Sequence, residues 1–131
     1  AASQPCISRF SNQGQAAEWV WVVTPEYNRG MSAAMKNAID VGSRPPVQNV
    51  WNNKPCAVIS ASPSTIGGMG ANMQLRQSLV VLNAPCMPME CYLHGVHLAF
   101  NEQDELSSEP VQKLLAKFVF ALQEWVNRFK E

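Results

Sequence analysis

The chain has 131 residues, with ten basic and ten acidic side chains and a formal net charge of zero. This length is sufficient for one domain over residues 1–131 and too short for two, and a balanced charge without a Lys/Arg cluster argues against nucleic acid or an anionic membrane as a main partner. The longest apolar runs are shorter than the roughly 20 residues that span a bilayer, and no secretory leader opens the chain, so we expect a cytoplasmic protein.

The first third of the chain predicts a helix end, a strand and a helix. Residues 1–16 are rich in Ser, Gln and Asn and are consistent with the end of a helix. The run over 17–23 is nearly all apolar and rich in β-branched and aromatic side chains, which is typical of a strand covered on both faces in a parallel sheet. Residues 32–41 mostly favour a helix. The segment Thr24-Pro25-Glu26-Tyr27-Asn28 is therefore predicted to form a turn at the carboxyl end of a strand, where ligands bind in open α/β sheets.

The remainder of the chain continues the alternation of strands and helices. A loop over 42–49 precedes a strand at 57–60, a Gly-rich segment at 62–70 and a helix at 71–82 that ends before Pro85. A third strand is expected near 89–93. The last helix has apolar residues at three- and four-residue spacing, which predicts a core-facing stripe: Val111, Leu114, Leu115, Phe118, Val119, Leu122, Trp125, Val126 and Phe129.

Several of these segments together resemble the NAD(P)H-dependent FMN reductases, a flavodoxin-like family that includes quinone, chromate and azo-dye reductases. The resemblance rests on Thr24-Pro25-Glu26-Tyr27-Asn28, Lys36-Asn37-Ala38-Ile39-Asp40 with Ser43-Arg44-Pro45, Lys54-Pro55, Ala61-Ser62-Pro63 with Ile66-Gly67-Gly68, Leu75-Arg76-Gln77 and Asn83-Ala84-Pro85. It implies a three-layer α/β/α fold with a parallel sheet in the order 2-1-3-4-5. The three strands found here correspond to the third, fourth and fifth, so the domain is expected to be incomplete at its N-terminus.

The resemblance also implies the cofactors and the residues that contact them. The cofactors are FMN and NAD(P)H, and the implied FMN contacts are Pro25, Glu26, Tyr27, Asn28, Ala61 and Ser62. Flavin chemistry needs no catalytic side chain, because the protein supplies position, hydrogen bonds and exclusion of side reactions. The phosphate of FMN binds in the family to a loop between the first strand and the first helix, and nothing before Trp19 resembles that loop.

Other polar residues allow alternative interpretations. Arg76 is expected to make a structural or interface ion pair, with Glu26 as a candidate partner, and a role in binding the phosphate of a nicotinamide cofactor is the rival hypothesis. The spacing Cys91-x-x-His94-x-x-His97 invites a zinc interpretation, but no fourth ligand follows, so no metal site is predicted. The four scattered cysteines are expected to be reduced core or surface residues, with disulfides as the weaker alternative.

The sequence thus leads to two functional hypotheses. The first is an oxidoreductase that passes hydride from NAD(P)H to FMN and on to a small-molecule electron acceptor, namely a quinone, a metal oxyanion, an azo compound or free flavin. The family implies a homodimer or homotetramer. The second hypothesis is a non-catalytic flavodoxin-like remnant or interaction module that cannot hold FMN tightly, because the phosphate loop is missing and each charge-assisted hydrogen bond is worth about 1.5–3 kcal/mol.

Overall fold

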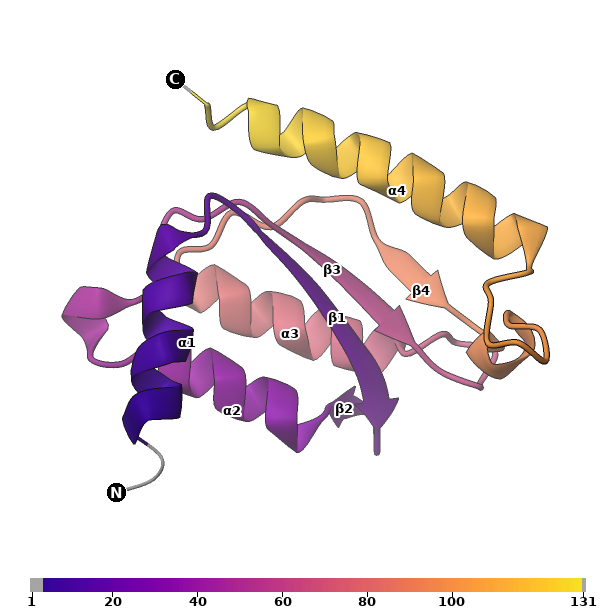
Figure 1. Ribbon diagram of the computed structural model, residues 1–131, viewed down its shortest axis with the longest axis horizontal. Helices are drawn as coiled ribbons and strands as arrows, with labels where there is room; N and C mark the ends of the chain where they lie inside the picture. Colours follow the sequence, from indigo (N-terminus) through magenta and orange to yellow (C-terminus); the bar gives the residue numbers. More distant parts are fainter. Residues whose placement is uncertain (1–3, 131) are drawn as a thin grey trace.

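The computed structural model describes residues 4–130, and its arrangement is shown in Figure 1. The helices are α1 (Gln4–Ala16), α2 (Ala33–Gly42), α3 (Met69–Val81) and α4 (Glu109–Asn127). The strands are β1 (Val20–Tyr27), β2 (Gly30–Met31), β3 (Cys56–Ala61) and β4 (Cys91–Leu93). Short 3₁₀ turns lie at Pro46–Gln48 and Val96–Leu98. None of the helices in this part of the chain is long and apolar enough to cross a membrane.

The four strands form one sheet in the order β2-β1-β3-β4. The β1, β3 and β4 strands are parallel, while β2 pairs antiparallel with the end of β1. Helices α2 and α3 cover one face and α4 covers the other, so the molecule has three layers (Figure 1). The predicted parallel strands and the three-layer arrangement are confirmed, whereas β2 was not anticipated.

Two hydrophobic clusters hold the layers together. The cluster beneath the sheet contains Val22 of β1, Ile39 of α2, and Leu75 and Leu79 of α3. The cluster on the opposite face joins the sheet to α4 through Ile59, Phe118, Leu122 and Val126. The apolar stripe of the last helix is therefore a core face, as its periodicity predicted.

The two long parallel strands differ in how well they are covered. In β3 the residues from Cys56 to Ile59 are at most 2% exposed, as expected for a central strand. In β1 the exposure alternates, since Val22 is buried while Trp21 and Val23 on the other face are 38% and 52% exposed. The expectation that β1 is covered on both faces is thus wrong. On that face α4 contacts β1 at Trp21, through Phe118, and leaves Val23 exposed, while β2 pairs with β1 only at Glu26 and Tyr27, so most of β1 is also the edge of the described sheet.

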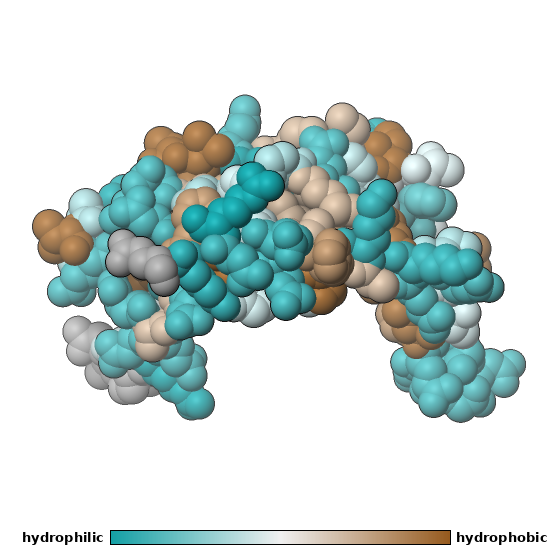
Figure 2. Space-filling model, turned by 90° about the horizontal axis from the view of Figure 1, so that it is seen from above, coloured by the Kyte–Doolittle hydropathy of each residue, from teal (hydrophilic) through white to brown (hydrophobic). Residues whose placement is uncertain are grey.

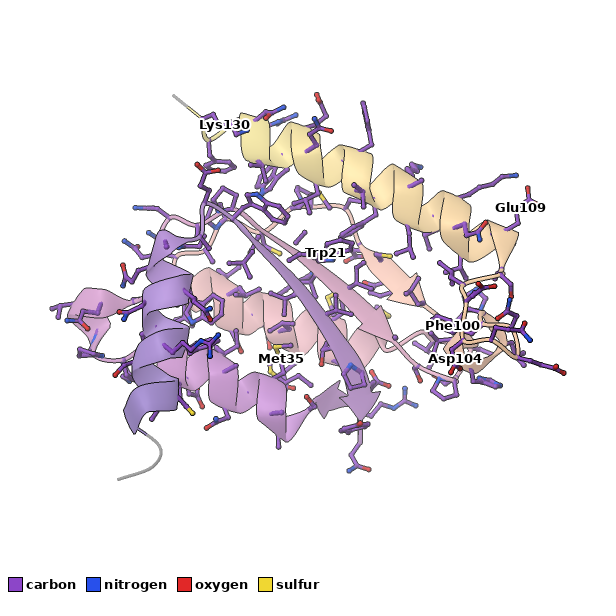
Figure 3. All side chains as sticks on the ribbon, viewed as in Figure 1. Trp21, Met35, Phe100, Asp104, Glu109 and Lys130 are labelled. Atoms are coloured by element: carbon purple, nitrogen blue, oxygen red, sulfur yellow. The ribbon has the colours of Figure 1, made fainter. Side chains whose placement is uncertain are left out.

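Trp21 joins the outer face of β1 to α4, the helix above it. It lies between β1 and α4 in Figure 3, and its ring centroid is 6.0 Å from that of Phe118. Seen from above, the surface is hollowed along one side, with hydrophobic and hydrophilic side chains both reaching it (Figure 2). Because Trp21 and Val23 are 38% and 52% exposed, the apolar outer face of β1 is only partly packed against the described chain.

Polar groups fix the helix ends. Ser32 begins α2 by accepting a hydrogen bond from the amide of Met35 at 3.2 Å, which is a standard N-cap. Lys54 caps the C-terminal end of α1, because its ammonium donates hydrogen bonds to the carbonyl oxygen of Ala17 at 2.6 Å and to that of Gly14. Burial lowers the pKa of Lys54 from its ordinary value. The Lys54-Pro55 pair thus ties the first helix to the start of β3.

Candidate functional site

The three parallel strands end together, which gathers the predicted site segments at one edge. Pro25 of β1 is paired with Ala61 of β3, and Ala61 is paired with Leu93 of β4. The residues that follow each strand therefore emerge side by side at the carboxyl edge of the sheet. This is the edge at which open α/β sheets bind ligands, and it confirms the adjacency of the 24–28 and 61–62 segments.

The segment Thr24–Asn28 is not the simple strand-to-helix turn that the sequence predicted. Its first four residues extend β1 to Tyr27, and a two-residue hairpin then returns the chain as β2 before α2 begins. The hairpin residues Asn28 and Arg29 have φ values of 51° and 67°. Two positive φ angles define a type I′ turn, whose twist matches that of antiparallel strands, and Asn tolerates this region well.

The side chains of the segment point in alternating directions. Pro25 and Tyr27 lie on the exposed face of β1, and Tyr27 is 63% exposed. The Glu26 side chain points the other way and is only 8% exposed. Its Oε2 accepts a hydrogen bond from the amide of Ala71 at 3.0 Å, and its Oε1 lies 3.8 Å from the guanidinium of Arg29. The Glu26 carboxylate thus caps α3, while the neighbouring aromatic side chain of Tyr27 is exposed to solvent.

The cap at Glu26 predicts a measurable loss of stability. Glu26→Ala removes the acceptor for the Ala71 amide and the favourable charge at the start of α3, so the free energy of unfolding is expected to fall by about 1–2 kcal/mol. Glu26→Gln retains an acceptor oxygen and should lose about half as much. Urea denaturation measures both, and equal stability of Glu26→Ala and the unsubstituted chain would contradict the capping role.

The segment after β3 is folded back on itself by internal hydrogen bonds. Ser62 is 7% exposed, its amide donates to the carbonyl oxygen of Leu93 at 3.0 Å, and its Oγ accepts from the amide of Ser64 at 3.1 Å. Ser60 Oγ donates to the carbonyl oxygen of Gly67 at 2.9 Å, and Gly67 and Gly68 have φ values of 64° and 80°. Ala61 lies at the strand end and is partly exposed. The loop is therefore an ordered turn, and Ala61 is its more accessible predicted contact.

Arg76 is held by a network that the sequence did not reveal. Its Nε donates to Asn72 Oδ1 at 2.8 Å, and its two terminal nitrogens donate to the carbonyl oxygens of Met87 at 2.9 Å and Met89 at 3.0 Å. Asn72 is fully buried and donates in turn to Ser60 Oγ and the carbonyl oxygen of Cys91, each at 3.3 Å. This network gives Arg76 a structural role, attaching α3 to the chain before β4.

The helix ends at the carboxyl edge show which part of a flavin nucleotide these residues fit. A phosphate usually binds free amides at a helix N-terminus. Here the α3 terminus already binds the Glu26 carboxylate and the α2 terminus is capped by Ser32. The exposed Tyr27 and the strand ends beside it instead offer a surface for a planar ring. Within residues 4–130, a side chain thus already binds one amide at each of these two helix ends, and the accessible strand ends are the candidate surface for the ring of FMN.

The histidines and cysteines of the described residues do not gather into a metal cluster, and the cysteines are not joined in disulfides. In the described part of the chain, no group of three or more His, Cys, Asp or Glu side chains could hold a metal ion. Cys91 is buried, whereas His94 and His97 are exposed. The four cysteines are free thiols in the structure, with Cys56 and Cys91 buried.

The fold and this edge define an α/β protein with a candidate ligand site where its parallel strands end. The model of the NADPH-dependent FMN reductase family matches residues 2–97. A quinone reductase of Pseudomonas putida KT2440 is 47% identical over 120 residues, which are 91% of this chain and 64% of that protein. An NAD(P)H-dependent FMN reductase of Pseudomonas aeruginosa PAO1 is 38% identical, covering 96% of this chain and 68% of that protein.

A solved structure agrees with the sequence relatives. FerB from Paracoccus denitrificans, a flavoenzyme NAD(P)H:(acceptor) oxidoreductase, superposes with a TM-score of 0.87 at 33% identity, covering 95% of this chain and 69% of FerB. The chain therefore belongs to the NADPH-dependent FMN reductase family and has its flavodoxin-like fold. It spans 64% of the length of the quinone reductase from P. putida KT2440.

Proposed function

We propose that this chain is the ring-binding part of an FMN-dependent oxidoreductase that takes hydride from NAD(P)H and delivers it to a small-molecule acceptor. The observation that carries the proposal is the row of strand ends, Pro25 and Ala61, with the exposed Tyr27 beside it. Family membership supports the same chemistry. Bound FMN would supply the hydride chemistry, with a quinone, a metal oxyanion, an azo compound or free flavin as the acceptor.

The chain's own residues position and shield the ring. Pro25, Tyr27, Asn28 and Ala61 would contact it, because they lie at the accessible carboxyl edge. Glu26 and Ser62 would not contact the ring directly. They would hold the start of α3 and the loop after β3 in place through their hydrogen bonds to the amides of Ala71 and Ser64. No side chain needs to take or give a proton in this scheme. Rigid placement of the strand ends is what the protein contributes.

The phosphate of FMN requires a second group of contacts. The α2 and α3 termini at this edge are capped internally. Because the relatives are longer than this chain, we propose that phosphate contacts come from a segment corresponding to part of their additional length. The single domain is then completed by that segment, which would also cover the outer face of β1, where Trp21 and Val23 are exposed.

Flavin titration tests the proposal directly. We expect the protein with its natural upstream segment to bind FMN and to oxidise NADPH in the presence of benzoquinone, and residues 1–131 alone to bind FMN more weakly. Equally tight binding by the two proteins would refute the role given to the upstream segment. Absence of both flavin binding and turnover in the longer protein would refute the oxidoreductase and leave the non-catalytic module.

A variant pair tests the ring contacts. Tyr27→Ala in the longer protein should weaken FMN binding roughly fivefold, because an aromatic contact of this kind contributes about 1 kcal/mol. Phe120→Ala is the matched control, since Phe120 is 67% exposed and belongs to α4 rather than to a segment that follows a strand. Equal dissociation constants for the two variants, from quenching of flavin fluorescence, would contradict the placement of the ring beside Tyr27.

We further propose a cytoplasmic homodimer or homotetramer. An apolar stripe on the outer side of α3 supports association, since Met69, Met73, Val80 and Val81 are 44%, 37%, 67% and 81% exposed. Apolar patches of this kind mark contact surfaces more often than free ones. Light scattering of the longer protein is expected to give a dimer or tetramer mass, and Val80→Asp should lower that mass.

A further inference from the structure

Two cysteines face each other at the amino edge of the sheet, opposite the candidate flavin site. Cys56 begins β3 and is bridged in parallel to Cys86, which precedes β4. The bridge is formed by the Cys56 amide, which donates to the carbonyl oxygen of Pro85 at 3.0 Å, and by the Met87 amide, which donates to that of Cys56 at 2.7 Å. Paired residues of neighbouring strands are about 5 Å apart and share a face, which is within the Cα range that a disulfide spans.

A fixed cation lies beside one of the two thiols. The guanidinium of Arg76 approaches Cys86 Sγ at 3.5 Å and is held in place by Asn72 and the carbonyl oxygens of Met87 and Met89. An adjacent cation stabilises the thiolate, which is the reactive form of cysteine. A hydrogen bond from the Cys56 thiol, and secondly the charge of Arg76, lower the pKa of Cys86 to about 7 although burial opposes the change.

The two sulfur atoms differ in environment. Cys86 is partly exposed and lines a surface cleft of about 330 Å³ with Asn53, Val80 and Asn83. Cys56 is 1% exposed, and its pKa is raised above the ordinary thiol value, chiefly by its hydrogen bond to Cys86 and by burial. The pair therefore combines a partly exposed cysteine beside a fixed cation with a buried, protonated cysteine paired to it.

We propose that Cys86 is a redox-modification site for hydrogen peroxide and that Cys56 is its resolving thiol. The Cys86 thiolate attacks one peroxide oxygen, so that an S–O bond forms, the O–O bond breaks, and the departing hydroxide takes a solvent proton to become water. Sulfur is oxidised to a sulfenic acid and peroxide is reduced. Cys56 sulfur then attacks the Cys86 sulfur, the S–S bond forms, the S–O bond breaks, and hydroxide leaves with the Cys56 proton as water.

This proposal does not depend on flavin binding. The reaction consumes two thiols and one hydrogen peroxide and yields one disulfide and two waters. Cys6, which is exposed, and Cys91, which is buried and has its pKa raised by burial to about 11, serve as internal references. Cys6 reports the reactivity that exposure alone produces. Cys91 reports the reactivity of a buried thiol, in which burial disfavours the thiolate.

The first experiment measures which thiol reacts. Iodoacetamide labelling of the intact chain at pH 7, followed by peptide mass spectrometry, is expected to modify Cys86 about tenfold faster than Cys6, because the Arg76 guanidinium beside Cys86 stabilises its thiolate. The Cys86 labelling rate should be half-maximal near pH 7, where the hydrogen bond from Cys56 and the charge of Arg76 place its pKa, and should level off at higher pH. Arg76→Lys places a shorter cationic side chain beside Cys86. It should slow the labelling of Cys86 and leave the labelling rate of Cys6 unchanged. A Cys86 rate no higher than that of Cys6 would overturn the proposal.

The second experiment follows the oxidised product. Brief peroxide treatment of the unsubstituted chain should give one peptide pair joined through Cys56 and Cys86, two hydrogens lighter and restored by dithiothreitol. Cys56→Ser should instead leave a sulfenic acid on Cys86 that dimedone traps, while Cys91→Ser is the matched control and should still form the disulfide. A bond through other cysteines, or direct overoxidation of Cys86 in the unsubstituted chain, would refute the resolving role of Cys56.

Discussion

Phe118→Ala is expected to lower the free energy of unfolding by about 3–5 kcal/mol, the range for deleting a buried phenyl ring. The Phe118 side chain is fully buried between α4 and the sheet, in the cluster that also contains Ile59 and Leu122. Its ring also packs against Trp21 of β1. Since domains of this size are stable by about 5–15 kcal/mol, the variant should lose a large share of its stability.

Phe120→Ala is the control, because it removes the same ring two residues later on the same helix. Phe120 is 67% exposed, and its loss should change the free energy of unfolding by no more than about 0.5 kcal/mol. Urea denaturation followed by tryptophan fluorescence compares the two variants. Similar midpoints for both would show that α4 does not pack on the sheet through Phe118.

Arg76→Met is expected to lower the free energy of unfolding by about 2–4 kcal/mol, because it leaves several inward-facing acceptors without their donor. The guanidinium binds Asn72 Oδ1 and the carbonyl oxygens of Met87 and Met89, so its loss separates α3 from the chain that leads into β4. Methionine retains much of the side-chain length. The effect therefore reports the hydrogen bonds more than the packing.

Lys113→Met is the control for Arg76→Met, because it also replaces one positively charged side chain by methionine. Lys113 is 75% exposed and pairs with Glu109 on the surface of α4, so its removal should cost no more than about 0.5 kcal/mol. Denaturant titration of both variants measures the difference. If Arg76→Met were as mild as Lys113→Met, Arg76 would not be a structural residue, and the alternative role in binding a cofactor phosphate would regain support.

Most of the fold could be predicted because it depends on local patterns. The apolar run before Thr24, the helix after Ser32 and the stripe from Val111 to Phe129 each signal one element through composition or period. The parallel strands then had to end together at one edge. The resemblance led to the family through segments spread along the whole chain, and the family match confirmed it.

The details of the candidate site could be predicted less well from the sequence. The hairpin at Asn28 and Arg29 was missed because an Asn-Arg pair is a weaker type I′ signal than Asn-Gly. Glu26 was expected only as a contact of the flavin or a partner of Arg76. Its hydrogen bond to Ala71 joins residues 45 positions apart, and no local pattern encodes such a pairing.

The sequence by itself determined the element types and the parallel sheet, because hydrophobic periods and turn residues act over a few neighbours, and the resemblance of its motifs indicated the family. Only the tertiary structure decided which polar groups meet. It showed Glu26 at the start of α3, Arg76 beneath the chain leading to β4, and Cys86 beside Cys56. The physical reason is that hydrogen bonds and thiol pairs depend on distances of a few ångströms between segments far apart in the chain, which are set only when the layers pack.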